Sequence, residues 1–208
     1  MERLNSEYCE ALKNEIRDVN CDSKIIKENL ITLGKNIGEK IYEKYFLDNK
    51  SITTPLGISI NGRYPLYKQI IIVSTSDDYE LFGNGIAQVF RNSKQGKIDF
   101  GGVHGFDALK SPFRSITLPD AQNVDTVIIA KSVLATGCTA ISLIRKVMEK
   151  YWPDNIIVAS IFYSEAGYAE LMNQSKTKDV FVIGNPDELL DNGLLSPGMG
   201  NLDERIKN

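Results

Sequence analysis

Residues 124–183 alternate between short apolar runs and amphipathic segments, and this alternation constrains the fold more than any other feature. Buried strands are predicted at Val124–Ala130, Ile156–Phe162 and Val180–Ile183, because these runs are continuous and rich in β-branched residues. Helices are predicted between them, at Thr139–Tyr151 and Glu165–Asn173. Strands and helices in alternation predict right-handed crossovers in an open, mostly parallel α/β sheet with helices on both faces. Such sheets bind ligands at the carboxyl ends of their strands.

The first half of the chain adds a helix and a further strand. Apolar residues recur at helical spacing from Ile26 to Tyr45, which predicts a helix with one buried face. The run Ile70–Val73 predicts another buried strand. Between them, Thr53–Pro65 is rich in proline and glycine, and Asn61-Gly62 predicts the turn of a β-hairpin. From Phe82 to Pro119 glycines are frequent, so we expect loops and short strands there.

Composition places the chain among soluble globular proteins. It has 208 residues, 42% hydrophobic and 25% charged, and no linker or repeat divides it. We therefore expect an N-terminal helix or arm over residues 1–23 and one domain over residues 24–208. A formal net charge of −3 argues against a nucleic-acid partner. The charged N-terminus and the lack of an apolar run of about 18 residues argue against a leader or a membrane span, so we expect a cytoplasmic protein.

A loop joins the strand that ends at Ala130 to the helix that begins at Thr139. At such a junction, free backbone N–H groups and the positive end of the helix dipole point at one place, which suits a phosphate monoester. Gly137 allows the backbone to approach closely, and Thr136 and Thr139 add hydroxyl donors. Because glycine and threonine also serve turns and helix caps, these residues alone leave a phosphate site and a plain turn both open.

Three blocks of the sequence resemble the uracil phosphoribosyltransferases, a family of the type I phosphoribosyltransferase class. Residues 133–140, VLATGCTA, are similar to the family's DPMLATGGT loop for the 5′-phosphate of phosphoribosyl pyrophosphate (PRPP). Residues 193–201, GLLSPGMGN, are similar to its uracil-binding stretch, GYIVPGLGD. Residues 54–57, TPLG, match a segment ahead of the first strand. Because the blocks follow the family's order, the resemblance implies a type I phosphoribosyltransferase fold.

The resemblance implies two ligand-binding segments. The phosphate and PRPP segment comprises Lys131, Ala135, Thr136, Gly137, Cys138 and Thr139. The base segment comprises Leu195, Pro197, Gly198, Gly200 and Asn201. Backbone groups of Leu195 and Gly200 would contact the base, and no residue is assigned as catalytic. The implied activity is transfer of a phosphoribosyl group from PRPP to uracil or a related base in pyrimidine salvage, with Mg²⁺ as the implied cofactor and a homodimer as the implied assembly.

Three substitutions fall where the family's polar PRPP and base ligands stand. Lys131 replaces an aspartate that contacts the ribose, Thr75 stands where an arginine holds pyrophosphate, and Asn201 replaces the aspartate after Pro-Gly-Leu-Gly. A pyrophosphate beside Asp77 and Asp78 would also meet repulsion. We therefore expect a nucleoside monophosphate or a related phosphosugar to bind more readily than PRPP, and an enzyme with altered substrate or reduced activity. The alternatives are a different base or donor whose anionic group meets Lys131, and a non-catalytic protein that binds a nucleoside monophosphate.

Other residues support weaker hypotheses. Arg91 and Arg114 lie in the stretch where the family has its second arginine, without a secure match. His104 is either a general acid or base, a role for which imidazoles are suited, or an ordinary loop residue. The thiol of Cys138 lies at a helix N-terminus, where its pKa would fall, or it is a small replacement for the family's glycine. The adjacent side chains of Asp77 and Asp78 should point apart, so no shared metal site is expected.

Overall fold

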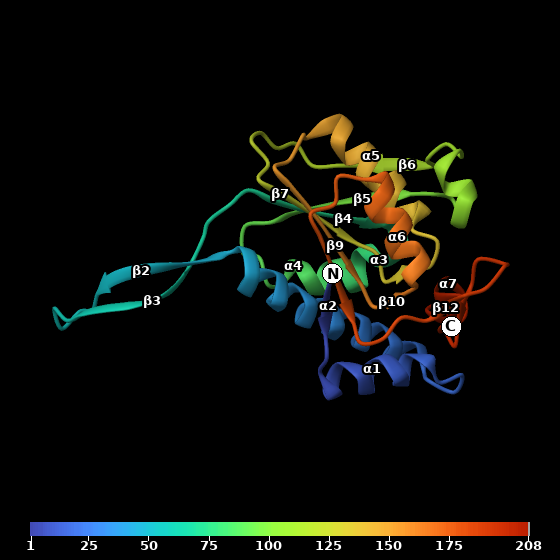
Figure 1. The fold of residues 1–208 in the computed structure, drawn as a ribbon, viewed down its shortest axis with the longest axis horizontal. Helices are drawn as coiled ribbons and strands as arrows, with labels where there is room; N and C mark the ends of the chain where they lie inside the picture. The colour runs from blue at the N-terminus through green and yellow to red at the C-terminus, as the bar shows by residue number, and fades with distance from the viewer. Residues whose placement is uncertain (208) are drawn as a thin grey trace.

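The computed structural model describes residues 1–207, and a seven-stranded sheet forms its centre (Figure 1). From edge to edge the strands are β1 (Glu2–Leu4), β11 (Asp179–Ile183), β9 (Asn155–Ser160), β7 (Thr126–Ala130), β4 (Ile70–Thr75), β5 (Lys94–Asp99) and β6 (Ser115–Thr117). All neighbours pair in parallel except β5 and β6, which are antiparallel. The predicted open, mostly parallel α/β sheet is confirmed.

Helices cover both faces of this sheet (Figure 1). One face carries α1 (Glu7–Arg17), α2 (Ser23–Tyr45), the π-helical turn η1 (Tyr79–Gly83) and α4 (Asn84–Ala87). The other face carries α5 (Cys138–Lys150), α6 (Glu165–Gln174) and the 3-10 turn η2 (Gly105–Leu109). Because successive side chains of a strand point to opposite faces, β4 contributes Ile70 and Ile72 to the core under α2, and Ile71 and Val73 to the core under α5.

One predicted strand is divided in the structure. The run Ile156–Phe162 forms β9 only as far as Ser160. Beyond that point the backbone N–H groups donate to the carbonyl of Ser132, past the end of β7. The chain then resumes as β10 (Phe162–Tyr163), which pairs in parallel with β8 (Val133–Leu134). This switch of partner carries the predicted phosphate loop away from the main sheet.

The predicted hairpin exists, but its turn lies elsewhere. β2 (Leu47–Thr53) and β3 (Ser59–Pro65) pair antiparallel and project as an arm from the domain (Figure 1). The prediction of a turn at Asn61-Gly62 is wrong, because Asn61 and Gly62 pair with β2 inside the arm. The turn is made by residues 54–58, where the N–H of Gly57 donates to the carbonyl of Thr54 at 2.9 Å and Gly57 has a φ of +76°. The TPLG segment is therefore the tip of the arm.

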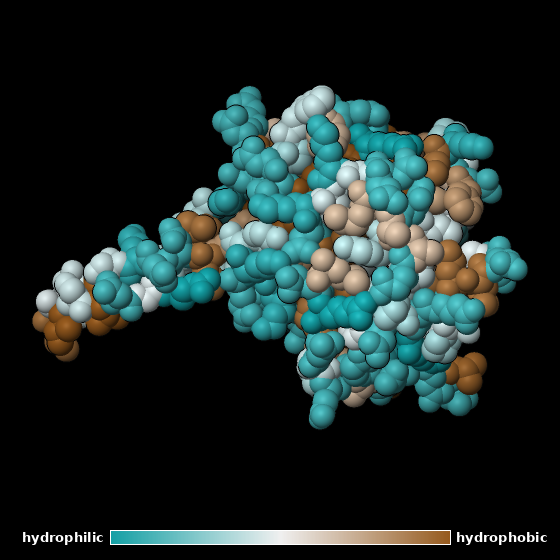
Figure 2. Space-filling model, in the orientation of Figure 1, coloured by the Kyte–Doolittle hydropathy of each residue, from teal (hydrophilic) through white to brown (hydrophobic). Residues whose placement is uncertain are grey.

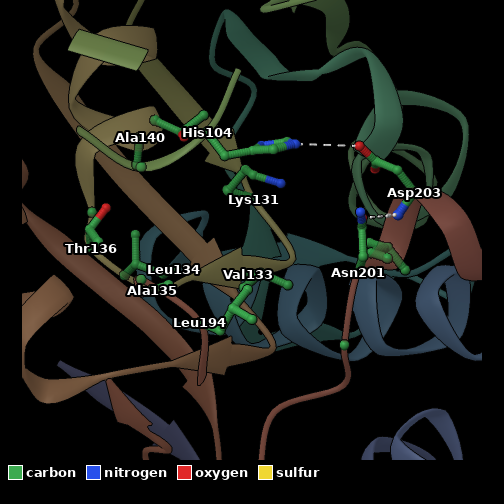
Figure 3. A pocket seen from close by; sticks show the side chains of 16 residues that line it. His104, Lys131, Val133, Leu134, Ala135, Thr136, Ala140, Leu194, Asn201 and Asp203 are labelled. Atoms are coloured by element: carbon green, nitrogen blue, oxygen red, sulfur yellow. Dashed lines mark hydrogen bonds and ion pairs between the residues drawn. The ribbon is translucent and has the colours of Figure 1, made fainter. Parts of the chain in front are cut away.

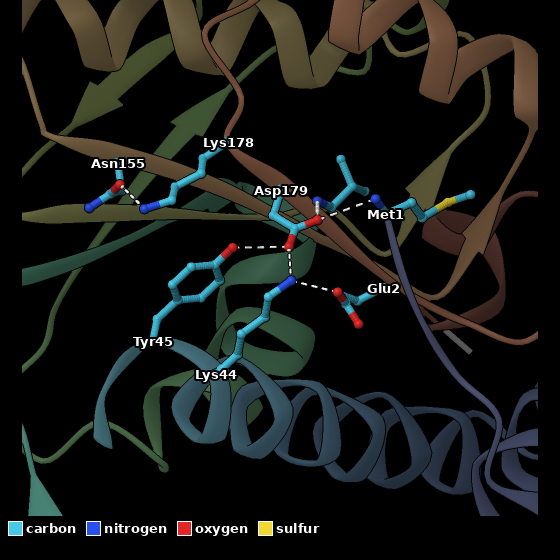
Figure 4. A network of polar contacts seen from close by, with 8 residues as sticks. Met1, Glu2, Lys44, Tyr45, Asn155, Lys178 and Asp179 are labelled. Carbon is cyan, nitrogen blue, oxygen red and sulfur yellow. Dashed lines mark hydrogen bonds and ion pairs between the residues drawn. The ribbon is translucent and has the colours of Figure 1, made fainter. Parts of the chain in front are cut away.

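Residues before α2 are integrated with the sheet. β1 pairs with β11 at the sheet edge, and α1 packs against α2. At the amino end of β11, the carboxylate of Asp179 accepts hydrogen bonds from Lys44 at 2.6 Å and from Tyr45 at 3.0 Å (Figure 4). The boundary that we place after residue 23 stays a prediction.

Short elements fill the region 82–119, as expected from its glycines. They are α4, β5, η2 and β6, joined by turns. Within residues 1–207, no helix combines the length and the apolar character that crossing a membrane requires.

Candidate functional site

A pocket of about 210 Å³ lies beyond the carboxyl end of β7 (Figure 3). Three segments line it, namely residues 104–105, 131–140 and 193–203. Its position is the one predicted for a ligand site in an open parallel sheet. The pocket therefore brings the two predicted ligand-binding segments together, although they are far apart in the sequence.

The loop after β7 is held by the protein itself. Its strand β8 pairs with β10, and the hydroxyl of Ser164 donates to the carbonyl of Ala135 at 2.6 Å. Gly137, the N-cap of α5, has a φ of +78°, and a Cβ at this position would lie 2.6 Å from the carbonyl oxygen of Gly167. Only glycine fits this conformation and this close approach without strain. The loop is thus shaped before any ligand binds.

The start of α5 has the chemistry of an anion receptor. The N–H groups of a first helical turn have no intrahelical acceptor, and the helix dipole places partial positive charge there. Thr136 and Thr139 line the pocket beside this turn. Backbone N–H groups and hydroxyls together suit a phosphate monoester.

Of the predicted phosphate segment, all but one residue line the pocket: Lys131, Ala135, Thr136, Gly137 and Thr139. The exception is Cys138, whose side chain is fully buried in the core under α5 and whose thiol donates to the carbonyl of Thr136 at 3.8 Å. The side chain of Cys138 is thus placed for packing.

The predicted base segment forms the opposite wall. Gly200 and Asn201 line the pocket, together with Leu194, whereas Leu195, Pro197 and Gly198 do not line it. The predicted residues of this segment that line the pocket are therefore the ones nearest the C-terminus.

Two turns give the base segment its course. β12 (Glu188–Leu189) pairs with β13 (Leu195–Ser196), and the tight turn after β13 depends on Gly198, where a Cβ would lie 2.2 Å from the carbonyl oxygen of Leu195. The side chain of Asn201 then caps α7 (Leu202–Arg205) by accepting a bond from the N–H of Asp203 at 3.1 Å.

A buried ion pair lies at the base of the pocket. The ammonium of Lys131 is 2.7 Å from Oδ2 of Asp78, and their side chains are 11% and 0% exposed. Burial lowers the pKa of Lys131, but the attraction and hydrogen bond of Asp78 outweigh it, so this pKa is raised. Thr75 also donates to Asp78, at 3.1 Å. The charge of Lys131 is therefore neutralised inside the protein, which argues against its binding an anionic group of a ligand.

Two further acidic groups flank this pair. Nε2 of His104 reaches across the pocket to within 3.6 Å of Oδ2 of Asp203 (Figure 3). The nearby imidazole of His104 lowers the pKa of Asp203. Burial, followed by repulsion from Asp203, raises the pKa of Asp77. Three carboxylates thus surround a single lysine, so this part of the pocket repels a polyanion.

The arginines considered from the sequence lie away from this pocket. Arg91 is exposed at a separate cavity near the base of the arm, and Arg114 is exposed beside Gly101. Among the described residues, Lys131 and His104 are the only basic side chains that line the pocket. Sequence reasoning missed the pairing of Lys131 with Asp78 and the approach of His104 to Asp203. The sequence shows Asp77 and Asp78 shortly after a predicted strand, but its pattern does not indicate which of the two carboxylates faces Lys131.

Comparisons with known proteins identify the family and the fold of this chain. A family model described as uracil phosphoribosyltransferase matches residues 4–207. The chain is 27% identical over 199 residues to a uracil phosphoribosyltransferase of Natronomonas pharaonis, covering 92% of this chain and 89% of that protein. It is 28% identical over 199 residues to one of Sulfolobus acidocaldarius, covering 92% and 91%. The solved structure of the AQ2163 protein from Aquifex aeolicus has the same fold, with a TM-score of 0.80 at 22% identity, covering 98% of this chain and 96% of that one.

Proposed function

This chain belongs to the uracil phosphoribosyltransferase family, whose enzymes are pentosyltransferases, and we propose that its pocket binds a pyrimidine nucleoside 5′-monophosphate. The phosphate would lie on residues 135–139 and the base beside residues 193–201. The observation that carries this proposal is that one pocket joins the N-terminus of α5 to the base segment.

Each end of the pocket supplies matching chemistry. The first turn of α5, with Thr136 and Thr139, offers N–H and hydroxyl donors to a phosphate. At the other end, backbone N–H and C=O groups are present whatever the side chain, so base recognition by Gly200, which lines the pocket, tolerates changes in the sequence. Val133 and Leu194 add apolar walls between the two ends.

We propose that transfer from PRPP is weakened or altered in this protein. Leaving pyrophosphate needs groups that stabilise its developing charge. At the position where the family's pattern has an arginine for pyrophosphate, this chain has Thr75. The hydroxyl of Thr75 donates to Asp78. Asp77 and Asp203 add negative charge where the polyanion would lie.

The family uses Mg²⁺ with PRPP, so the pocket would need oxygen ligands for this ion. Within residues 1–207, no three His, Cys, Asp or Glu side chains are grouped to hold an ion. Asp78 is already bound to Lys131. The residues of this pocket therefore do not fit a resident Mg²⁺ site.

Calorimetry with UMP, ribose 5-phosphate and PRPP, each with and without Mg²⁺, tests the proposal. We expect UMP to bind most tightly, ribose 5-phosphate less tightly, and PRPP most weakly. Tight, Mg²⁺-dependent binding of PRPP would contradict the proposal.

The buried pair of Lys131 and Asp78 favours a second candidate, a non-catalytic protein that binds nucleoside monophosphates. The double variant Lys131→Asp with Thr75→Arg separates the two, because it places at these two positions the aspartate and the arginine that the family's pattern has there. Release of pyrophosphate from PRPP and uracil by this variant supports an impaired enzyme. A variant that binds UMP but releases no pyrophosphate supports the non-catalytic protein.

We also propose that the protein is a homodimer in which the arm contacts the second copy. An isolated two-stranded hairpin is marginally stable, and this arm has few buried residues of its own. Apolar side chains gather at its tip, where Leu56 is 85% exposed and Ile58 is 58% exposed (Figure 2). Sedimentation of Leu56→Ser with Ile58→Ser should give a lighter species than the wild-type protein, and an unchanged mass would contradict the proposal.

A further inference from the structure

One side chain, Arg205, binds the base segment to the C-terminal end of α1. Its Nη1 donates to the carbonyl of Met199 at 3.0 Å and to the carbonyl of Ile16. Its Nη2 donates to the carbonyl of Asp18 at 2.5 Å. The last carbonyls of a helix lack intrahelical donors and carry the negative end of the dipole, so they hold a guanidinium well. Arg205 thus fixes Met199 relative to a rigid helix.

This bond acts on the peptide unit between Met199 and Gly200. A trans peptide is planar, so the C=O of Met199 and the N–H of Gly200 point in opposite directions. A carbonyl held on Arg205 therefore fixes the direction of the N–H of Gly200. Gly200 lines the pocket, whereas Arg205 does not. The φ of Gly200, +75°, is one that glycine adopts without strain.

We propose that Arg205 is a positioning residue for the base, acting through the Met199–Gly200 peptide without touching the ligand. The inference rests on the proposed function, in which the N–H of Gly200 donates to a carbonyl of the pyrimidine. The planar fork of an arginine suits three carbonyls at once, and the single ammonium of a lysine does not. The N-terminal helix α1 thereby becomes part of the support of the ligand site.

The test compares two ligands that differ only by the base. Calorimetry gives the dissociation constants of UMP and of ribose 5-phosphate for the wild-type protein and for Arg205→Met, which keeps the aliphatic stem. We expect UMP to bind about fivefold to tenfold more weakly, the effect of one hydrogen bond. Ribose 5-phosphate, which has no base, should change by less than about twofold on the same scale. A general loss of structure would weaken both ligands alike.

Arg17→Met is the matched control. Arg17 is the last residue of α1 and binds a later part of the chain, through Oδ1 of Asp187 at 2.5 Å, but its bond does not involve the Met199–Gly200 peptide. We expect this variant to change the affinities for UMP and ribose 5-phosphate by the same factor. A selective loss of UMP affinity in Arg17→Met as large as that in Arg205→Met would overturn the specific role of Arg205.

The remaining outcomes are distinguishable. Equal effects on both ligands in Arg205→Met, or no effect, would overturn the positioning role. If Arg205→Met does not fold, Arg205→Lys takes its place, and an unchanged ratio of the two affinities in that variant overturns the role as well. A wild-type protein that binds UMP no better than ribose 5-phosphate shows instead that the proposed base site is wrong.

Discussion

Two lysine–aspartate pairs lie at opposite ends of the same parallel sheet. At the amino end, Lys44 is 2.6 Å from Asp179, whose carboxylate also accepts bonds from Tyr45 and a backbone N–H. At the carboxyl end, Lys131 is 2.7 Å from Asp78, whose Oδ1 is buried and has no hydrogen-bond partner within residues 1–207. The distances are nearly equal, and the surroundings differ.

This difference separates a pair within the fold from one beside the candidate site. Burial raises the pKa of Asp179, but its bonds to Lys44 and Tyr45 outweigh that effect, so the pKa is lowered and the charged form is stable in place. Asp78 lies beside a pocket with one oxygen unsatisfied, an arrangement that folding alone does not favour. An incompletely bonded buried charge beside a cavity is typical of a functional site.

The largest expected effect comes from breaking the pair at the carboxyl end. Lys131→Met leaves the fully buried carboxylate of Asp78 without its cation, so we expect the free energy of unfolding to fall by about 3–5 kcal/mol. Chemical denaturation measures it. The double variant Lys131→Met with Asp78→Leu serves as the control and should recover much of the loss. A loss below about 1 kcal/mol for the single variant, the scale of a surface pair, would mean that the pair is not buried in solution.

The next largest effect is expected from Gly137, where a side chain would meet both an unfavourable φ and a close neighbouring carbonyl. Gly137→Ala places a Cβ against the carbonyl of Gly167, whereas Gly57→Ala at the arm tip has a similar φ and open space around it. We expect Gly137→Ala to cost about 1–3 kcal/mol more than Gly57→Ala, the price of overpacking. It should also weaken binding of ribose 5-phosphate by at least about tenfold, since the loop must move. Thermal unfolding and calorimetry measure both, and equal costs would argue against the close approach.

A smaller effect is expected from breaking the pair at the amino end. Lys44→Met removes a lysine whose side chain is 40% exposed, and Asp179 keeps its bond from Tyr45. We therefore expect a loss of about 1 kcal/mol in the free energy of unfolding, with no change in ligand affinity. Chemical denaturation of Lys44→Met and Lys131→Met under the same conditions measures the two losses. Losses of similar size in the two variants would remove the distinction between the two ends.

The smallest effect is a difference in pH dependence. The folded-state pKa of Asp179 is lowered, so its stabilisation is present above its unfolded pKa of about 3.9 and is lost as the pH falls through the folded value. The pKa of Asp77 is raised, mainly by burial, so ionised Asp77 destabilises the fold at neutral pH. Melting curves should show Asp179→Asn less stable and Asp77→Asn more stable than the wild-type protein near neutral pH. Both differences should shrink in acid, and shifts of the same sign would contradict the assignment.

The fold was predictable because its signal is local. Continuous apolar runs such as Ile70–Val73 can be buried only by cover on both faces, and helices between such runs determine the parallel order. The turn of the arm was not predictable from Asn61-Gly62, because residues 54–58 provide a competing turn and the pairing register decides between them. The end of β9 at Ser160 depended in the same way on a distant carbonyl, that of Ser132.

The sequence by itself determined the α/β sheet, the loop at the start of α5, and the close backbone approach at Gly137. These follow from local periodicity and from residue chemistry that acts over a few positions. Only the tertiary structure decided that Lys131 binds Asp78, that His104 faces Asp203, and that Arg205 joins the base segment to α1. Charged side chains are long and pair across large sequence separations, so their partners depend on how the elements pack and not on the pattern along the chain.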